Sequence, residues 1–192
     1  MSIRERRERE RADRERLIVT AARELAEAEG WEAVTTRRLA DRVEYSQPVL
    51  YSHFKSMGAI MAAVAVEGFA DLAAQLRAVR AGEPDPARAL AGVGSVYLGF
   101  AERRPALYDA MFAHAVDLPF AMADAPESLR AGFGELAEAL RPYAGGEDLG
   151  LLTETYWAAL HGLATLARGG RLPARFRDRR LAILLERFTA AG

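Results

Sequence analysis

Residues 35–55 gather the side chains in this chain that are best suited to recognising a nucleic acid. Gln47 can form a bidentate hydrogen bond to adenine, and Arg37 can reach a guanine edge or a phosphate. Apolar contact with a thymine methyl group is available from Pro48, Val49 and the ring of Tyr51. Candidate phosphate partners are Thr36, Tyr51, His53 and Lys55. Because no acidic residue lies between Tyr45 and Lys55, this face predicts contact with DNA.

The other chemistry-bearing residues do not form a recognisable catalytic or metal site. The chain has no cysteine, which excludes thiolate nucleophiles, disulfides and cysteine-rich metal sites. Its three histidines, His53, His114 and His161, lie far apart in the sequence. We find no Gly-rich phosphate loop, nucleophile elbow or His/Glu metal spacing. We therefore expect a protein that is not an enzyme and that uses no metal or cofactor.

Three predicted helices would position the residues of the 35–55 segment. The first ends at Gly30 and carries an apolar stripe at helical spacing, which consists of Leu17, Ala21, Ala22, Leu25, Ala26 and Ala28. The second begins at a Thr35-Thr36 cap and ends near Glu44. Its inward residues are Leu39, Ala40 and Val43. These two helices make a small core on which a third can be anchored.

The third helix is short and carries the candidate base contacts. Ser46 is predicted to cap it, and Pro48 is tolerated in its first turn. Leu50 and Phe54 lie four residues apart and would face the core, which leaves the opposite face free. Two short helices joined by a turn of three to four residues are a helix-turn-helix. Free N–H groups at the helix starts would attract phosphate oxygens.

The rest of the chain also predicts helices and no sheet. Hydrophobic residues make up 51% and charged residues 28% of the 192 residues, and the strong helix formers Ala, Leu, Arg and Glu dominate. Further helices are expected at 57–80, 87–103, 105–114, 127–140, 148–168 and 174–190, with a break at 82–86 and a loop around 119–126. We predict an all-α fold with an N-terminal three-helix helix-turn-helix domain over residues 1–60. A larger helical ligand-binding and dimerisation domain would follow over residues 61–192.

Residues 1–16 form a charged arm in which arginine and glutamate alternate. One interpretation is a solvated arm or a helix extension supported by i,i+4 ion pairs. The other is an arm whose arginines approach DNA phosphates or the minor groove. The arm lacks the apolar stretch of a signal peptide, and no apolar run approaches about 20 residues, the length of a membrane span. We expect a soluble, cytoplasmic protein without a membrane partner.

The segment from about Leu17 to Ile60 resembles the DNA-binding signature of the TetR family of transcription regulators. Positions that match together include the Thr35-Thr36 pair, Ser46 and the Leu-Tyr-x-His-Phe run of residues 50–54. The resemblance implies base contacts from Arg37, Gln47, Pro48 and Tyr51. It also implies a transcription regulator, usually a repressor, that binds double-stranded operator DNA as a homodimer.

Two positions depart from the family pattern. The turn usually carries glycine where this chain has Glu44, and a left-handed backbone there costs about 1 kcal/mol for a residue other than glycine. Glu44 also places a negative charge near the DNA. Met57 replaces the usual lysine at the start of the fourth helix, so one phosphate contact is in question, and Lys55 can partly substitute. Both changes suggest modest affinity or an unusual operator.

The segment of residues 156–166 resembles a Trp-x-x-x-His-Gly segment found in one branch of TetR-like C-terminal domains. Trp157 and His161 share a helix face. His161 either points into a ligand cavity or is a buried histidine bonded to a backbone carbonyl beside the dimer interface. The small residues Ala158, Ala159, Gly162 and Thr165 permit close approach of another helix.

Aromatic residues and methionines of the middle and C-terminal helices are candidates for a pocket that takes a small, largely apolar effector. The alternative for each is ordinary core. The predicted lining comprises Tyr97, Phe100, Tyr108, Met111, Phe112, Phe133, Trp157 and His161, and His114, Phe120 and Met122 carry the same pattern.

The last two long helices are predicted to form the dimer seam, as half of a four-helix bundle. Its apolar residues would be Leu152, Leu160, Leu163, Ile183, Leu184 and Phe188. An effector would favour a dimer geometry that separates the two recognition helices. The competing interpretation is a helical ligand-sensing protein with weak or lost DNA binding, favoured by Glu44 and Met57.

Overall fold

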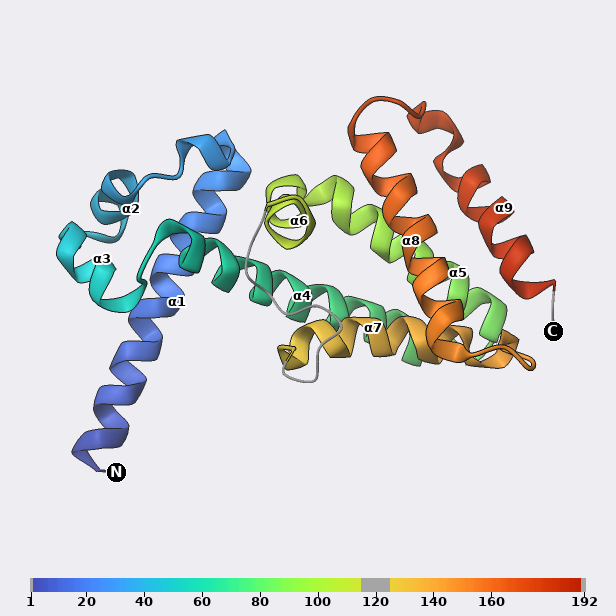
Figure 1. The fold of residues 1–192 in the computed structure, drawn as a ribbon, viewed down its shortest axis with the longest axis horizontal. Helices are drawn as coiled ribbons and strands as arrows, with labels where there is room; N and C mark the ends of the chain where they lie inside the picture. Colours follow the sequence, from blue (N-terminus) through green and yellow to red (C-terminus); the bar gives the residue numbers. More distant parts are fainter. Residues whose placement is uncertain (1, 115–124, 191–192) are drawn as a thin grey trace. The chain divides into compact units, whose positions relative to one another are not determined.

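The computed structural model describes residues 2–114 and 125–190, and over these residues the chain is built from helices (Figure 1). The α-helices are α1 (Ile3–Glu29), α2 (Thr36–Val43), α3 (Gln47–His53), α4 (Met57–Ala81), α5 (Pro86–Arg103), α6 (Pro105–Phe112), α7 (Glu127–Leu140), α8 (Leu149–Arg168) and α9 (Arg177–Thr189). Short 3₁₀ turns lie at Trp31–Ala33, Arg141–Tyr143 and Ala174–Phe176. The all-α prediction is confirmed.

The predicted element boundaries agree with this structure to within a few residues, with three differences. The charged arm is helical, so α1 begins at Ile3 rather than near Leu17. The helix expected at 105–114 ends at Phe112, and the one expected at 174–190 begins as a 3₁₀ turn. Most of the predicted 119–126 loop, with Phe120 and Met122, lies outside the described residues.

The chain divides into two compact units. The first contains residues 2–68 and 104–114, and the second contains residues 69–103 and 125–190. Helix α4 runs through the boundary, so its first half belongs to one unit and its second half to the other. One 18-residue window of α4 is apolar enough, by length and composition alone, to cross a membrane. Its buried residues include Ile60, Val64, Phe69, Leu72 and Leu76, which is the pattern of a core helix.

In the first unit, α1 packs against α2, α3 and α6. Its buried residues are Ile18, Val19, Ala21, Ala22, Leu25 and Ala26. The predicted stripe is therefore wrong at its two ends, because Leu17 is 46% exposed and Ala28 is exposed as well. The inward face of α1 passes through Ile18 and Val19 instead, which lie one helical turn before Ala21 and Ala22.

Side chains of α1 and the following turn hold the start of α6. The carboxylate of Glu27 accepts hydrogen bonds from the N–H groups of Ala106 and Leu107, at 3.2 and 3.0 Å. The indole N–H of Trp31 donates to the carbonyl of Ala106 at 2.7 Å. The carboxylate satisfies N–H groups that a helix start leaves unpaired and also complements the positive end of the helix dipole. Helix α6 is thereby fixed to the helix-turn-helix.

In the second unit, α5 packs against α7, α8 and α9. Gly94 makes this close packing possible, because a Cβ atom there would lie 2.7 Å from Leu181 and 2.9 Å from the hydroxyl of Tyr156. Tyr156 is fully buried, and its burial raises the pKa of its hydroxyl. Leu90 and Leu160 complete this part of the core with no exposed surface.

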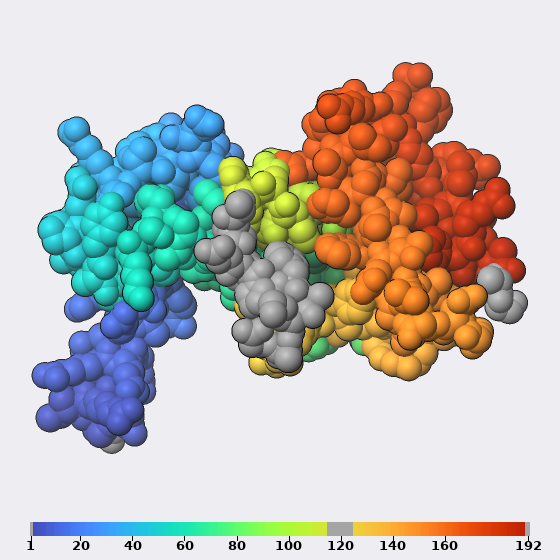
Figure 2. Space-filling model, viewed as in Figure 1, coloured from blue at the N-terminus to red at the C-terminus, as the bar shows by residue number. Residues whose placement is uncertain are grey.

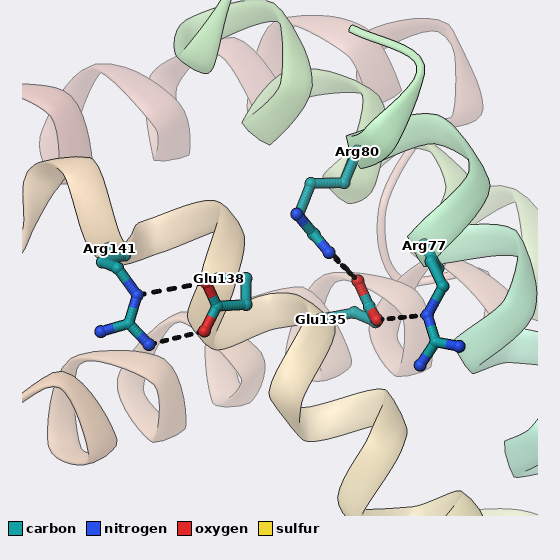
Figure 3. Close-up of polar contacts among 5 residues, drawn as sticks. All are labelled: Arg77, Arg80, Glu135, Glu138 and Arg141. Atoms are coloured by element: carbon teal, nitrogen blue, oxygen red, sulfur yellow. Dashed lines mark hydrogen bonds and ion pairs between the residues drawn. The ribbon is translucent and has the colours of Figure 1, made fainter. Parts of the chain in front are cut away.

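A buried carboxylate joins α7 to the second half of α4 (Figure 3). Glu135 is 6% exposed and accepts hydrogen bonds from the Nε atoms of Arg77 and Arg80, at 2.7 and 2.8 Å. One turn away, Glu138 pairs with Arg141 on the surface. Two cations compensate the desolvation of Glu135, so α7 is held in one register on α4.

Candidate nucleic-acid interface

Helix α3 presents a polar face outward while one residue anchors it. Leu50 is 1% exposed, whereas Gln47, Pro48 and Val49 are all exposed. Tyr51 is 52% exposed, so it does not fill the three-helix core. The predicted base-contact residues on α3 are therefore all accessible, as the residues of a recognition helix must be.

Ser46 occupies the N-cap of α3, as predicted, but its side chain makes no capping hydrogen bond. Its backbone is extended, and its carbonyl accepts from the N–H groups of Val49 and Leu50 at 3.0 and 3.2 Å. Phe54 follows the last residue of α3 and is only half-buried, so of the two expected anchors Leu50 alone is fully enclosed.

Two of the arginines of α2 form ion pairs with α1, and the third is exposed without such a pair. Arg38 donates two hydrogen bonds to the carboxylate of Glu29, at 2.9 and 2.6 Å, and Arg42 pairs with Glu24 at 2.8 Å. The hydrogen bond from Arg38 lowers the pKa of Glu29. Both pairs join α2 to α1. Arg37 is exposed and makes no ion pair with any described residue, so its guanidinium is available to a partner.

Two hydroxyl groups link the start of α2 to the outer face of α3. The Oγ1 of Thr36 and the phenolic oxygen of Tyr51 lie 3.2 Å apart, at hydrogen-bonding distance. Thr35 caps α2, because its hydroxyl accepts from the N–H of Arg38 at 3.3 Å. The candidate phosphate partner Thr36 and the candidate base contact Tyr51 therefore form one connected polar surface.

His53 does not occupy the outer surface expected from the sequence. Its side chain is only 8% exposed, and its Nδ1 lies 3.5 Å from the Oε1 of Glu15 on α1. The long α1 extension explains the difference, because it covers the end of α3. Lys55 is exposed beyond α3. Ser56 then caps α4 through its hydroxyl, which accepts from the N–H of Ala59 at 3.1 Å.

Glu44 adopts the left-handed conformation that the turn requires, with φ of 57° and ψ of 36°. It is the one residue other than glycine with positive φ in the described part of the chain. Its N–H and that of Tyr45 both bond to the carbonyl of Ala40, which closes the end of α2. Glu44 therefore carries the free-energy cost of a left-handed backbone at a residue other than glycine.

The α1 extension projects from the helix-turn-helix and is exposed up to Arg14 (Figures 1 and 2). A capping box at Ser2 and Glu5 starts it. Ion pairs at i,i+4 spacing then support it, namely Arg4–Glu8, Arg6–Glu10 and Arg11–Glu15. The charged arm is therefore a helix extension supported by i,i+4 ion pairs, as its first interpretation had it.

The eight candidate effector-pocket residues are distributed over both units. Tyr108, Met111 and Phe112 belong to the first unit, and the other five belong to the second. Four of the eight are almost completely buried: Tyr97, Phe100, Tyr108 and Met111. Phe112, Phe133, Trp157 and His161 are half-buried. Of the three other residues with this pattern, His114 packs edge-on against Trp31 at 6.0 Å between ring centroids.

Trp157 and His161 each contact a polar side chain. The indole N–H of Trp157 donates to the hydroxyl of Tyr97 at 3.0 Å. The Nε2 of His161 lies 3.4 Å from the hydroxyl of Thr165. Burial and, to a smaller extent, the positive charge of Arg168 lower the pKa of His161. The neutral imidazole is therefore favoured near pH 7.

The candidate seam residues differ in how much surface they expose. Leu160 is completely buried within the chain, so it cannot reach a partner. Leu152, Leu163, Leu184 and Phe188 are half-buried, and Ile183 is 43% exposed. Sequence reasoning missed Leu151 and Leu166, which are 65% and 39% exposed on α8. They share a helix face with Ala158 and Gly162. The spacing of these residues in the sequence could have revealed that face.

Across residues 2–114 and 125–190, no group of three or more His, Cys, Asp or Glu side chains is placed to hold a metal ion. The arrangement instead offers an exposed, uncompensated arginine, two linked hydroxyl groups and a polar helix face. These groups can make hydrogen bonds to phosphates and base edges.

Comparisons with known proteins match both parts of the chain. Residues 18–64 match the model of bacterial regulatory proteins of the tetR family, and residues 90–190 match that of the tetracyclin repressor-like C-terminal domain. The uncharacterized HTH-type transcriptional regulator Rv0681 of Mycobacterium tuberculosis is 29% identical over 186 residues, covering 91% of this chain and 83% of that protein.

Two solved structures illustrate the likeness in fold. A protein of unknown function from Rhodococcus sp. RHA1 has a TM-score of 0.77 at 23% identity, covering 93% of this chain and 95% of that one. RolR in complex with the ligand resorcinol has a TM-score of 0.69 at 19% identity, covering 93% of this chain and 89% of that one.

Proposed function

The chain belongs to the tetR family of bacterial regulatory proteins, and from this premise we propose that it is a homodimeric repressor released from a palindromic operator by a small, largely apolar ligand. Family membership makes it a helix-turn-helix DNA-binding regulator of transcription and not an enzyme. We assign operator binding to residues 1–60 and effector binding and dimerisation to residues 61–192, in the cytoplasm.

The observation that carries the proposal is the exposed face of α3 above its buried Leu50. Gln47 reads a base edge by a bidentate hydrogen bond, and Pro48, Val49 and Tyr51 supply apolar contact with thymine methyl groups. Arg37, Thr36, Ser46 and Lys55 hold the phosphate backbone and set the register. His53 acts indirectly in this proposal, because its contact with Glu15 positions the end of α3.

Dimerisation is supported by the outward face of α8. Leu151, Ala158, Gly162 and Leu166 line it, and nothing lies within 4 Å of a Cβ atom placed on Gly162. A helix of a second copy can approach such a face closely, and Ile183 of α9 extends the apolar surface. A two-fold pair presents two α3 helices to two half-sites about one turn of DNA apart.

Effector binding is proposed for the second unit, near Tyr97, Trp157 and His161. Trp157 and His161 are half-buried, so part of each ring can contact an apolar ligand, and Tyr97, which accepts a hydrogen bond from Trp157, holds the indole from inside the core. RolR, a protein of this fold, has a solved structure in complex with the ligand resorcinol. The ligand would favour dimers whose recognition helices no longer match the operator spacing.

Selection of bound sequences from a random duplex library, at fixed near-physiological salt, tests the DNA-binding part. We expect enrichment of a palindrome, with half-sites about 10 base pairs apart between centres or a multiple of that spacing. The Gln47→Ala variant should relax the preference at one position of each half-site. Gln75→Ala, which changes a glutamine bonded to Asp71 on α4, is the matched control. Failure of the wild-type protein to enrich any sequence would contradict the proposal.

The second candidate function is a helical ligand-sensing protein with weak or lost DNA binding. Glu44 favours it, because this residue keeps a strained backbone and an acidic side chain beside the proposed interface. Salt dependence separates the two candidates, since neutralising phosphates gives a steep decline of affinity with salt concentration. A sensor without DNA binding would show no salt-dependent binding to any duplex.

A further inference from the structure

A cleft of about 290 Å³ lies in the second unit where the later parts of α5 and α8 meet the start of α9. Its apolar wall includes Leu98, Leu163, Ala164 and Leu172. The volume is just below the roughly 300–1,000 Å³ typical of small-molecule sites, so it suits a compact ligand. None of the eight residues proposed for the effector pocket lines it, so the cleft is a separate feature.

The charged residues of the cleft are unbalanced. Three arginines, Arg168, Arg177 and Arg180, line it together with one carboxylate, Glu102. All three arginines are half-buried, whereas Glu102 is exposed. Cations collected in a partly desolvated place repel one another more strongly than they would in water. The positive charge of Arg180, which no described carboxylate pairs with, therefore favours an anion at this position.

Arg177 already has a structural role in the wall of the cleft. Its Nε lies 3.0 Å from the Oε1 of Glu102, and its Nη2 donates to the carbonyl of Ser95 at 3.0 Å. A further pair with Asp178 at 3.3 Å lies at the start of α9. Arg177 thus joins α9 to α5, and Glu102, the one carboxylate that lines the cleft, is paired with it.

Arg180 lies one helical turn beyond Arg177 and makes no ion pair with any described residue. Its guanidinium carbon is 5.9 Å from the ring centroid of Phe176, a weak cation–π contact. Arg168 lines the cleft from the last turn of α8, and its positive charge contributes to the lowered pKa of His161. Helix α9 begins at Arg177, so the positive end of its dipole lies at the same edge.

We propose that this cleft binds a small organic anion, namely a carboxylate attached to a compact aryl or short acyl group. A guanidinium binds a carboxylate through two parallel hydrogen bonds. Arg180 can make both bonds, because it pairs with no described carboxylate. The apolar group would rest on Leu98, Leu163 and Leu172. The charge balance disfavours a cation, and the volume is small for a polyphosphate ligand.

Calorimetric titration of the full chain with 3-phenylpropanoate and with its neutral amide, 3-phenylpropanamide, tests the proposal without any DNA. We expect the acid to bind at least about tenfold more tightly than the amide, with affinity that falls as salt is added. Methyl resonances of Leu98, Leu163 and Leu172 should shift on binding, and those of Leu140, which does not line the cleft, should not.

Variants locate the anion contact. Arg180→Gln should weaken binding of the acid at least about tenfold and leave the amide unchanged, while Arg180→Lys should lose less because it keeps the charge. Arg130→Gln, an equal change of charge at an exposed position of α7, is the matched control. Unchanged thermal unfolding would show that Arg180→Gln is folded.

The proposal would be overturned by equal binding of acid and amide, by unaltered binding by the Arg180→Gln variant, or by no binding of the acid at millimolar concentrations. Methyl shifts confined to residues outside the cleft would do the same. These outcomes do not bear on operator selection, so the proposed function stands or fails separately.

Discussion

The hydroxyl groups of Thr36 and Tyr51 lie 3.2 Å apart, so the first turn of α2 is connected directly to the exposed face of α3. Either hydroxyl can be the donor. The contact holds the Tyr51 ring outward without burying it, since the residue remains 52% exposed. A side chain oriented in this way loses little rotamer freedom when it meets DNA, which favours affinity.

Replacing Tyr51 tests its place in the interface. Tyr51→Ala should weaken operator binding by about 1–3 kcal/mol without altering the dimer, because ring and hydroxyl contacts are both lost. Tyr51→Phe should lose less, since the ring remains and only the bond to Thr36 and any phosphate contact disappear. Fluorescence anisotropy with the selected operator measures both. Unchanged affinity of Tyr51→Ala would exclude Tyr51 from the interface.

Glu44 should limit the stability of the helix-turn-helix. Glu44→Gly should raise the free energy of unfolding by about 1 kcal/mol, because glycine adopts the left-handed conformation without a Cβ clash. Glu44→Ala removes the charge and keeps the strain, so it should give little gain in stability. Urea denaturation distinguishes the two. Equal stabilisation by both substitutions would show that charge, rather than backbone conformation, is the cost.

The proposed dimer seam can be tested by placing a charge on the outward face of α8. Ala158→Arg should convert a dimer into a monomer, because an unpaired guanidinium would be buried between two helices. Ala74→Arg adds the same charge at an exposed position of α4 and should leave the dimer intact. Sedimentation equilibrium reports the mass. A dimer that survives Ala158→Arg places the seam elsewhere.

The two glutamates of Figure 3 should differ in their contribution to stability. Glu135→Gln should lower the free energy of unfolding by about 1–3 kcal/mol, a value reduced from that of a fully buried pair because Arg77 is 63% exposed. Glu138→Gln breaks the surface pair with Arg141 and should change stability little. Chemical denaturation of both variants makes the comparison. Equal losses would contradict the structural importance of Glu135.

His161 should make the second unit less stable in mild acid. Its pKa in the folded protein lies below the usual 6.5, so the unfolded chain binds more protons between the two values. The contribution is fully present above about pH 6.5 and is lost as the pH falls through the folded-state pKa. His161→Gln should therefore flatten the decline of the unfolding temperature over this range.

Titration of the imidazole resonances by NMR measures the pKa of His161 directly. Arg168→Gln should move this pKa upward, although not fully to 6.5, because burial is the larger of the two causes and remains. A wild-type pKa at or above 6.5 would contradict the prediction.

The all-α fold, most helix boundaries and the helix-turn-helix could be predicted from the amino-acid sequence. These features depend on local signals: Thr35 and Asp148 cap helices through their own side chains, and Gly30 and Gly169 lie where helices end. The left-handed backbone at Glu44, which the family's usual glycine made a condition rather than a prediction, is also local, since it concerns one residue and its turn. Helical periodicity placed Leu50 inward and Gln47 outward for the same reason.

Which surfaces remain exposed depends instead on how the helices pack. The length of α1 placed Glu15 over His53 and so removed that histidine from the outer face of α3. Leu160 and Leu151 are equally apolar, yet one is fully buried and the other is 65% exposed, because α5 and α7 cover one face of α8 and leave the opposite face open. Burial depends on neighbours distant in sequence, which composition and spacing do not specify. The cluster of Arg168, Arg177 and Arg180 beside Leu98 likewise exists only once α5, α8 and α9 pack together.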